Sequence, residues 1–331
     1  MTTMNPKPVP LDPEMLAPLA LLVPPDTPPM TRAMLAAIRA EMERGIPSVE
    51  AAVGDLPVEW SEHRAPGPDG GDDIPITILA PRGHGARVKA GGAPLPALYN
   101  IHGGGMMVGN RRMDVPRLAA MVVEHGVVAA TVDYRLAPEH PDPAPVEDCH
   151  AGLVWFAGQA RDLGIDPDRL IVMGGSAGGG LSAGVALMAR DRNSVKLAGQ
   201  LLLCPMIDDT NSTLSSHQFL AGTTWTRAAN LLGWECLLGD RMGTDQVSPY
   251  AAPTRAADLS GLPPAFIEAG SAEMFRDENI AYANRIWAAG GSAELHVWSG
   301  GFHGFDVFAP ESELARAALA SRSSWIRRIL R

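Results

Sequence analysis

A serine lies within a glycine-rich turn between two apolar runs, in the stretch LIVMGGSAGGGLSAGVALMA at residues 170–189. Residues 174–178 fit the pattern G-x-S-x-G, in which the serine stands on a strained turn between a strand and a helix. The flanking residues must be small because the strand and helix backbones pass too closely for a Cβ atom. The pattern predicts that Ser176 is a nucleophile, although by itself it is equally compatible with a tight turn that has no function.

Glycine-rich turns also occur in two nucleotide-binding motifs. A phosphate loop is excluded because no Lys-Ser or Lys-Thr pair follows the glycines here. Residues 178–183 do spell G-x-G-x-x-A, but this stretch starts inside the expected helix and not at the turn before it. We therefore expect no dinucleotide site and no cofactor.

Serine is a weak nucleophile and needs a base, an orienting acid and donors for the developing oxyanion. Residues 102–105, His-Gly-Gly-Gly, directly follow the apolar strand expected at 97–102. Three adjacent glycines let backbone N–H groups approach an oxyanion without interference from side chains, as in the HGGG loop of esterases. A purely structural turn is the alternative, but two such motifs, each after an apolar strand, argue against a chance match.

The base should come last in the chain, after the acid. His303 lies in the glycine-flanked stretch SGGFHGF, after the last expected strand, where a loop side chain can reach the serine. His296 lies within that strand and is expected to face a packed layer. His140 and His150 precede the serine, so we predict that His303 is the base.

The acidic residue of the triad is expected just after the end of the strand predicted at 264–270. Glu273 lies nearest to the end of this strand, and Asp277 follows one helical turn later. Glu268 lies inside the strand and is the weaker candidate. We predict Glu273 as the acid and keep Asp277 as the alternative, with a capping or loop-supporting role if it is not the acid.

Apolar strands alternate with helical segments from about residue 57 onward, which predicts a mostly parallel sheet covered by helices on both faces. The stretch 206–245 has no strand pattern and is expected to form a helical cap together with residues 1–50. The core would then comprise residues 57–205 and 246–331. Six apolar residues of the insertion could line the site, but most are expected to form the cap's own core: Leu214, Phe219, Trp225, Leu231, Leu232 and Trp234.

Composition narrows the possible partners and the compartment. The 331 residues carry a net charge of −10, with no marked basic run, so we expect neither nucleic acid nor an anionic membrane as a partner. Cys149, Cys204 and Cys236 are too widely spaced for a metal site and are expected to be reduced and structural. The first residues lack an apolar leader, and no apolar run is long enough to cross a membrane, which favours a cytoplasmic protein.

The sequence resembles the bacterial hormone-sensitive-lipase-like esterases, a family of α/β-hydrolases. The resemblance rests on HGGGMMVGN, DYRLAPEHPDPAPVED, GGSAGGGL, SPYAAP, GSAEMFRDE and GGFHGF, and it extends from about residue 57 to the end. It implies an α/β-hydrolase fold with a helical cap, and a Ser176–His303–Glu273 triad. It also implies an oxyanion hole formed by the N–H groups of Gly104, Gly105 and Ala177.

Two positions depart from the family pattern. Gly175 stands where the family often has aspartate, and Glu273, which is one methylene longer, stands where aspartate is usual. The second departure bears on which residue is the acid.

The resemblance implies hydrolysis of short to medium acyl esters through an acyl-enzyme intermediate, without a metal or cofactor, on a small-molecule ester. Several relatives form dimers, so a homodimer is possible. A specialised amide, lactone or carbamate hydrolase remains an alternative. A non-catalytic receptor on this fold is disfavoured because plant hormone receptors of this kind have lost the catalytic histidine, which is present here as His303.

Overall fold

A computed structural model describes residues 6–331. One eight-stranded sheet forms its centre, in the order β1-β2-β4-β3-β5-β6-β7-β8. β1 and β2 pair antiparallel, as do β2 and β4, and all other neighbours are parallel. The strands are β1 (Val58–Ala65), β2 (Ile74–Pro81), β3 (Leu95–Ile101), β4 (Val128–Val132), β5 (Ile165–Gly175), β6 (Gly199–Leu203), β7 (Ala265–Gly270) and β8 (Ala293–Trp298).

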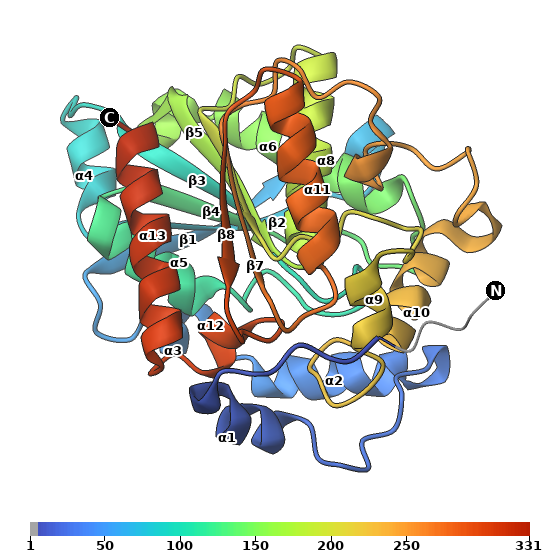
Figure 1. Ribbon diagram of the computed structural model, residues 1–331. Coiled ribbons are helices and arrows are strands. Elements are labelled where there is room, and N and C mark those ends of the chain that lie inside the picture. Colours follow the sequence, from blue (N-terminus) through green and yellow to red (C-terminus); the bar gives the residue numbers. More distant parts are fainter. Residues whose placement is uncertain (1–5) are drawn as a thin grey trace.

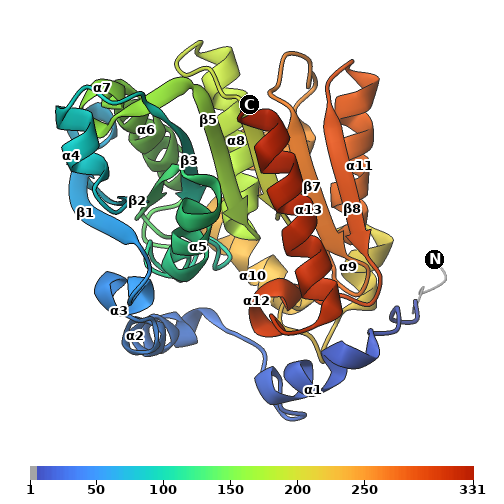
Figure 2. The same cartoon turned by 90° about the vertical axis from the view of Figure 1, so that its left-hand side faces the viewer.

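Helices cover both faces of the sheet, as expected (Figure 1; Figure 2). One face carries α6 (Ala144–Gly158), α8 (Ala177–Asp191) and α11 (Arg276–Ala288). The other carries α3 (Val49–Val53), α5 (Val115–His125) and α13 (Glu313–Ile329). Three short helices complete the core: α4 (His84–Lys89), α7 (Ala160–Leu163) and α12 (Phe305–Phe308). Helix α4 lies in the glycine-containing segment 83–94 between β2 and β3.

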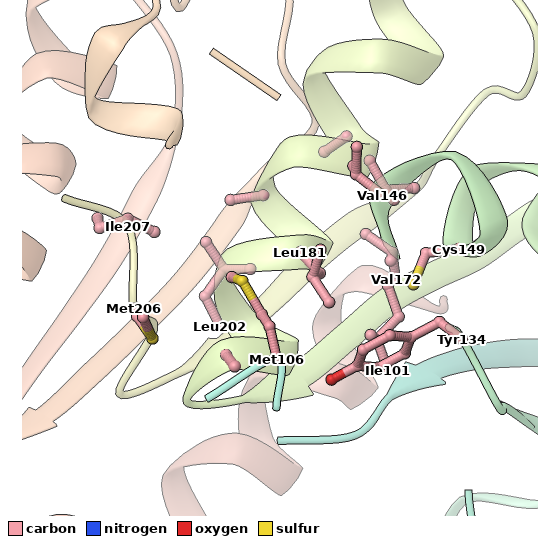
Figure 3. Close-up of a cluster of buried hydrophobic side chains, with 14 of the residues drawn as sticks. Ile101, Met106, Tyr134, Val146, Cys149, Val172, Leu181, Leu202, Met206 and Ile207 are labelled. Carbon is pink, nitrogen blue, oxygen red and sulfur yellow. The ribbon is translucent and has the colours of Figure 1, made fainter. Parts of the chain in front are cut away.

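The two hydrophobic layers follow from alternation along the strands. In β5, Val172 packs into the layer under α6 and α8, whereas Ile171 and Met173 pack into the layer under α5 and α13. Together with Leu170 these side chains are fully buried, so residues 170–173 form a continuous apolar run in the second half of the strand. Figure 3 shows Val172 in the first layer, close to Leu181 of α8 and Cys149 of α6.

Four helices lie beyond the carboxyl ends of the parallel strands, at the lower end of the molecule in Figure 1. They are α1 (Pro13–Leu22), α2 (Leu35–Gly45), α9 (Leu214–Gln218) and α10 (Arg227–Leu238). A single 3-10 turn at Arg32–Met34 leads directly into α2. Within residues 206–245 the structure contains helices and turns without a strand, as the sequence predicts for this described segment.

The N-terminal helices contact the loops at this end of the sheet directly. Arg39 of α2 donates to the backbone carbonyls of Met107 and Ala137, both at 2.7 Å, and to the Glu139 carboxylate. Met15 and Leu19 of α1 pack in one buried cluster with residues 302–318. Helix α2 therefore contacts the loops that follow β3 and β4, and α1 packs against the segment that follows β8. Within residues 6–331 no helix is both long and apolar enough to cross a membrane.

Candidate active site

Ser176 lies at the turn between β5 and α8, with φ +58° and ψ −123°. This left-handed conformation is rare for a residue with a side chain and is held by three backbone hydrogen bonds. The Ser176 N–H donates to the carbonyl of Leu203, and its own carbonyl accepts from the N–H groups of Gly180 and Met206. The turn therefore exposes the Ser176 hydroxyl above the carboxyl edge of the sheet.

The glycines around the serine are required by close backbone contacts. A Cβ at Gly174 would lie 2.4 Å from the Gly178 backbone, and one at Gly178 would lie 2.0 Å from the carbonyl oxygen of Ile101. Gly175 differs, because a Cβ there would meet nothing closer than 3.9 Å, where the Arg117 guanidinium lies. The space at Gly175 could therefore accommodate a side chain.

Three side chains expected from the sequence form a continuous hydrogen-bonded chain. His303 lies in the loop between β8 and α12, and its Nε2 is 2.9 Å from the Ser176 Oγ. Its Nδ1 is 2.5 Å from Oε2 of Glu273, which is only 1% exposed. The other carboxylate oxygen of Glu273 accepts from the Gly270 N–H at 2.7 Å. Glu273 is thus fixed between the end of β7 and the imidazole ring.

The other carboxylate candidates have different partners. Asp277, in the first turn of α11, accepts from the Ser215 N–H at 2.7 Å and from Arg276, so it links α11 to α9. Glu268 pairs with the buried guanidinium of Arg322. His296 stacks between Phe266 and Trp298, as expected for a histidine in a packed layer.

The glycine loop at 102–105 passes directly against the serine turn. A Cβ at Gly103 would lie 2.9 Å from the Gly175 carbonyl oxygen and 3.5 Å from the Ser176 Cβ. Gly104 and Gly105 have φ of +109° and +62°. Within the described residues, the N–H groups of Gly104, Gly105 and Ala177 donate no hydrogen bond, although their neighbours Met107 and Val108 both donate to the Gly104 carbonyl. These three N–H groups are therefore left without an acceptor within residues 6–331.

A buried pair of stacked rings, His102 and Tyr134, packs against this loop. The imidazole of His102 is fully buried and stacks on Tyr134 with ring centroids 4.2 Å apart. The Tyr134 hydroxyl donates to the His102 carbonyl at 3.0 Å. His102 therefore supports the loop from below, consistent with its assignment to the loop and not to the base.

Opposing effects set the pKa of His303. Burial lowers it, whereas the Cys204 sulfur and the Glu273 carboxylate raise it and leave the pKa of His303 well above its ordinary value of 6.5. Burial also raises the pKa of the Cys204 thiol, although His303 acts against this shift. The imidazole can therefore accept a proton readily and is stabilised when it carries positive charge.

Trp225 closes one side of the site. A Cβ on Gly105 would lie only 2.4 Å from the edge of the Trp225 ring, and the centroids of the Trp225 and His303 rings are 6.5 Å apart. The indole N–H donates to Asn230, whose amide donates to Asn211. The neighbouring Thr224 hydroxyl donates to the His303 carbonyl at 2.6 Å. Of the other apolar residues named from the sequence, Phe219 and Trp234 are buried, Leu231 and Leu232 are partly buried, and Leu214 is 47% exposed.

Sequence reasoning missed three contacts of this site. Cys204 was expected to be structural, yet its sulfur lies within 4.8 Å of a ring nitrogen of His303. Trp225 was not distinguished from its apolar neighbours, and Arg39 was not singled out, although it anchors α2 to the glycine loop. The only sequence signal for Cys204 is its place directly after the strand next to β5, where side chains reach the same edge of the sheet. The three cysteines are free, in agreement with expectation.

Comparisons with known proteins place these features in a family. A family model described as alpha/beta hydrolase fold matches residues 98–307. Carboxylesterase NlhH of Mycobacterium tuberculosis is 36% identical over 259 residues, which cover 77% of this chain and 78% of that protein.

Solved structures agree over almost the whole chain. A structure titled bacterial heroin esterase is 38% identical, covers 97% of this chain and 98% of its own, and superposes with a TM-score of 0.87. Esterase LipW from Mycobacterium marinum is 30% identical, covers 99% of both chains and has a TM-score of 0.84. The expected fold and the expected resemblance are both confirmed.

Proposed function

We propose a catalytic mechanism for this chain, which belongs to the alpha/beta hydrolase fold family and is a carboxylic ester hydrolase. In this mechanism Ser176 is the nucleophile, His303 the general base and Glu273 the acid that orients it. The observation that carries the proposal is the hydrogen-bonded chain from the Ser176 Oγ to Nε2 of His303, at 2.9 Å, and from Nδ1 to Glu273, at 2.5 Å. Such a chain converts a weak hydroxyl nucleophile into a reactive one.

The reaction proceeds in two acyl-transfer steps. The Ser176 Oγ attacks the ester carbonyl carbon while its proton passes to Nε2 of His303, and Glu273 stabilises the imidazolium that forms. The N–H groups of Gly104, Gly105 and Ala177 donate to the resulting oxyanion. The alcohol leaves with the proton from Nε2, and an acyl group remains on Ser176. Water, deprotonated by the same nitrogen, then attacks the acyl carbon; the bond from that carbon to the Ser176 Oγ breaks, Nε2 returns the proton to Oγ, and the carboxylic acid is released.

The substrate class we propose is esters with short to medium acyl chains. The support is the edge of Trp225, which occupies the space directly above Gly105 and narrows the room beside the oxyanion donors. Trp225 is itself only 8% exposed and is held by Asn230, so this wall is fixed. A long or branched acyl group would have to displace it.

The helices beyond the carboxyl ends of the strands form the cap in this proposal, with residues 1–50 and 206–245 as its two parts and 57–205 with 246–331 as the core. The position of α1, α2, α9 and α10 beyond the carboxyl ends of the parallel strands supports this division (Figure 1). Val49 and Val53 of α3 pack in the core layer with α5, so the connection between the two parts begins at about this helix.

We further propose that the protein acts in the cytoplasm, where thiols stay reduced. Its free cysteines support this proposal.

We also propose that the protein forms a homodimer. β8 ends the sheet and leaves one edge without a neighbouring strand in the described chain. Size-exclusion chromatography with light scattering tests the assembly, and a monomeric mass at micromolar concentration contradicts it.

The proposed nucleophile is tested with p-nitrophenyl acetate, butyrate, octanoate and laurate. We expect the wild type to hydrolyse the shorter esters and Ser176→Ala to lose at least about 10⁴-fold in kcat. Ser182→Ala is the matched control, because Ser182 lies on the same helix and donates to the Gly178 carbonyl, away from His303. If Ser176→Ala retains a tenth of the wild-type rate, or if none of the esters is hydrolysed, the proposal is wrong.

A further inference from the structure

Cys204 lies directly after β6, with φ +40°, and its sulfur lies beside the His303–Glu273 pair. The Cys204 Sγ, one ring nitrogen of His303 and one carboxylate oxygen of Glu273 all lie within 4.8 Å of one another. The proposed ester hydrolysis uses the nitrogen and the carboxylate and has no step for the thiol. A sulfur, a nitrogen and an oxygen donor this close together can serve as ligands of one metal ion.

We propose that Cys204, His303 and Glu273 form an inhibitory site for a thiophilic divalent cation, for which Zn²⁺ is the probe. Zn²⁺ binds sulfur at about 2.3 Å and nitrogen and oxygen at about 2.0–2.2 Å, so donors around a tetrahedral ion lie roughly 3.3–3.8 Å apart. The three donors here all lie within 4.8 Å of one another. The contact between Nδ1 and Oε2, at 2.5 Å, must open by about 1 Å to admit the ion, and the sulfur needs to approach by at most about 1 Å.

The reason that binding blocks catalysis lies in the imidazole tautomer; this step rests on the proposed role of His303. The ion takes the lone pair of Nδ1, so the single proton of the neutral ring moves to Nε2. A protonated Nε2 cannot accept the proton of Ser176, and the hydroxyl is no longer activated. The thiol proton is released to solvent as the thiolate binds, and a water molecule fills the fourth position of the ion.

The thiolate sets the selectivity among cations. A sulfur ligand favours Zn²⁺ over Mg²⁺, which prefers six oxygen ligands in octahedral geometry. Glu273 and the imidazole alone would give a weak, unselective site. Cys204 therefore distinguishes this proposal from a general effect of metal ions on histidines.

The test begins with Zn²⁺ titrations of esterase activity after removal of metal with EDTA. The proteins are the wild type, Cys204→Ser and the control Cys236→Ser, and each is compared with its own metal-free rate. We expect the wild type and Cys236→Ser to lose activity at the same Zn²⁺ concentration and to recover it with EDTA. Cys204→Ser should need at least about tenfold more Zn²⁺. Mg²⁺ at the same concentration should not inhibit.

A second measurement does not depend on turnover. Co²⁺ is added to Ser176→Ala and to Ser176→Ala/Cys204→Ser, and the near-ultraviolet thiolate-to-cobalt band is recorded. We expect one Co²⁺ per chain, with a band that requires Cys204. Equal Zn²⁺ inhibition with and without Cys204, a missing thiolate band, or a wild type that is active and unaffected by Zn²⁺ overturns the proposal. A wild type without esterase activity instead refutes the proposed function, and the cobalt band still decides whether the site exists.

Discussion

Replacement of Glu273 by glutamine changes one atom of the proposed triad and reverses the direction of one hydrogen bond. The Oε1 of Glu273 accepts from the Gly270 N–H at 2.7 Å, and this donor selects the amide oxygen of the glutamine. The amide nitrogen then faces Nδ1 of His303 across the distance that is 2.5 Å in the native protein. Because that nitrogen only donates, the imidazole must present its lone pair at Nδ1 and carry its proton on Nε2.

The expected loss follows from this wrong tautomer together with the missing negative charge. A corresponding change of an aspartate to asparagine in a serine protease lowers kcat by about 10⁴, or roughly 5.5 kcal/mol of transition-state stabilisation. We expect Glu273→Gln to lose about 10³–10⁴ in kcat. Glu273→Asp should retain more activity, because it keeps the charge but withdraws the carboxylate by about 1.5 Å, to roughly 4 Å from Nδ1.

The assay is kcat and KM with p-nitrophenyl butyrate, and Asp277→Asn is the matched control. Asp277 is also a carboxylate of the 273–278 stretch, but its hydrogen bonds to Ser215 and Arg276 join α11 to α9. We expect Asp277→Asn to change kcat by less than about tenfold. A Glu273→Gln variant within tenfold of the wild type, or an Asp277→Asn variant with the larger loss, would refute this reasoning.

Two further predictions concern the acid limb of the pH profile and the pocket wall. Activity needs Nε2 of His303 unprotonated, and the pKa of His303 is raised above 6.5, so kcat/KM of the wild type should fall as pH drops through a midpoint above 6.5. The residual activity of Glu273→Gln should persist to lower pH, because a charge that raises this pKa is gone; a wild-type midpoint below 6.5 would contradict the sign. Trp225→Phe should raise the octanoate-to-butyrate ratio of kcat/KM several-fold, up to about tenfold, by freeing space above Gly105. Trp234→Phe, the same change at a fully buried tryptophan of α10, should leave the ratio unchanged, and equal ratios in both variants would count against Trp225 as the wall.

The sequence alone determined the local features of this site. The turn at Ser176 is encoded by glycines that the structure requires, since a Cβ at Gly174 or Gly178 would lie within 2.4 Å of backbone atoms. These contacts join β5, the turn and α8 to one another and to the adjacent strand β3. A short sequence motif is therefore enough to predict the conformation of the turn. The order of the HGGG loop, the serine and His303 along the chain likewise sufficed to predict the fold that the comparisons confirm.

Only the tertiary structure decided which side chains meet. Glu273 and Asp277 are four residues apart and chemically similar, and the geometry of the β7–α11 connection directs one toward His303 and the other toward α9. Cys204 and Trp225 reach the same site from a strand end and from the segment beyond it. Their proximity to His303 depends on how β6, β8 and the cap helices are packed together. Contacts between residues about 80 to 100 positions apart leave no periodic or spacing signal in a single sequence, so the thiol beside the imidazole could be recognised only in the folded molecule.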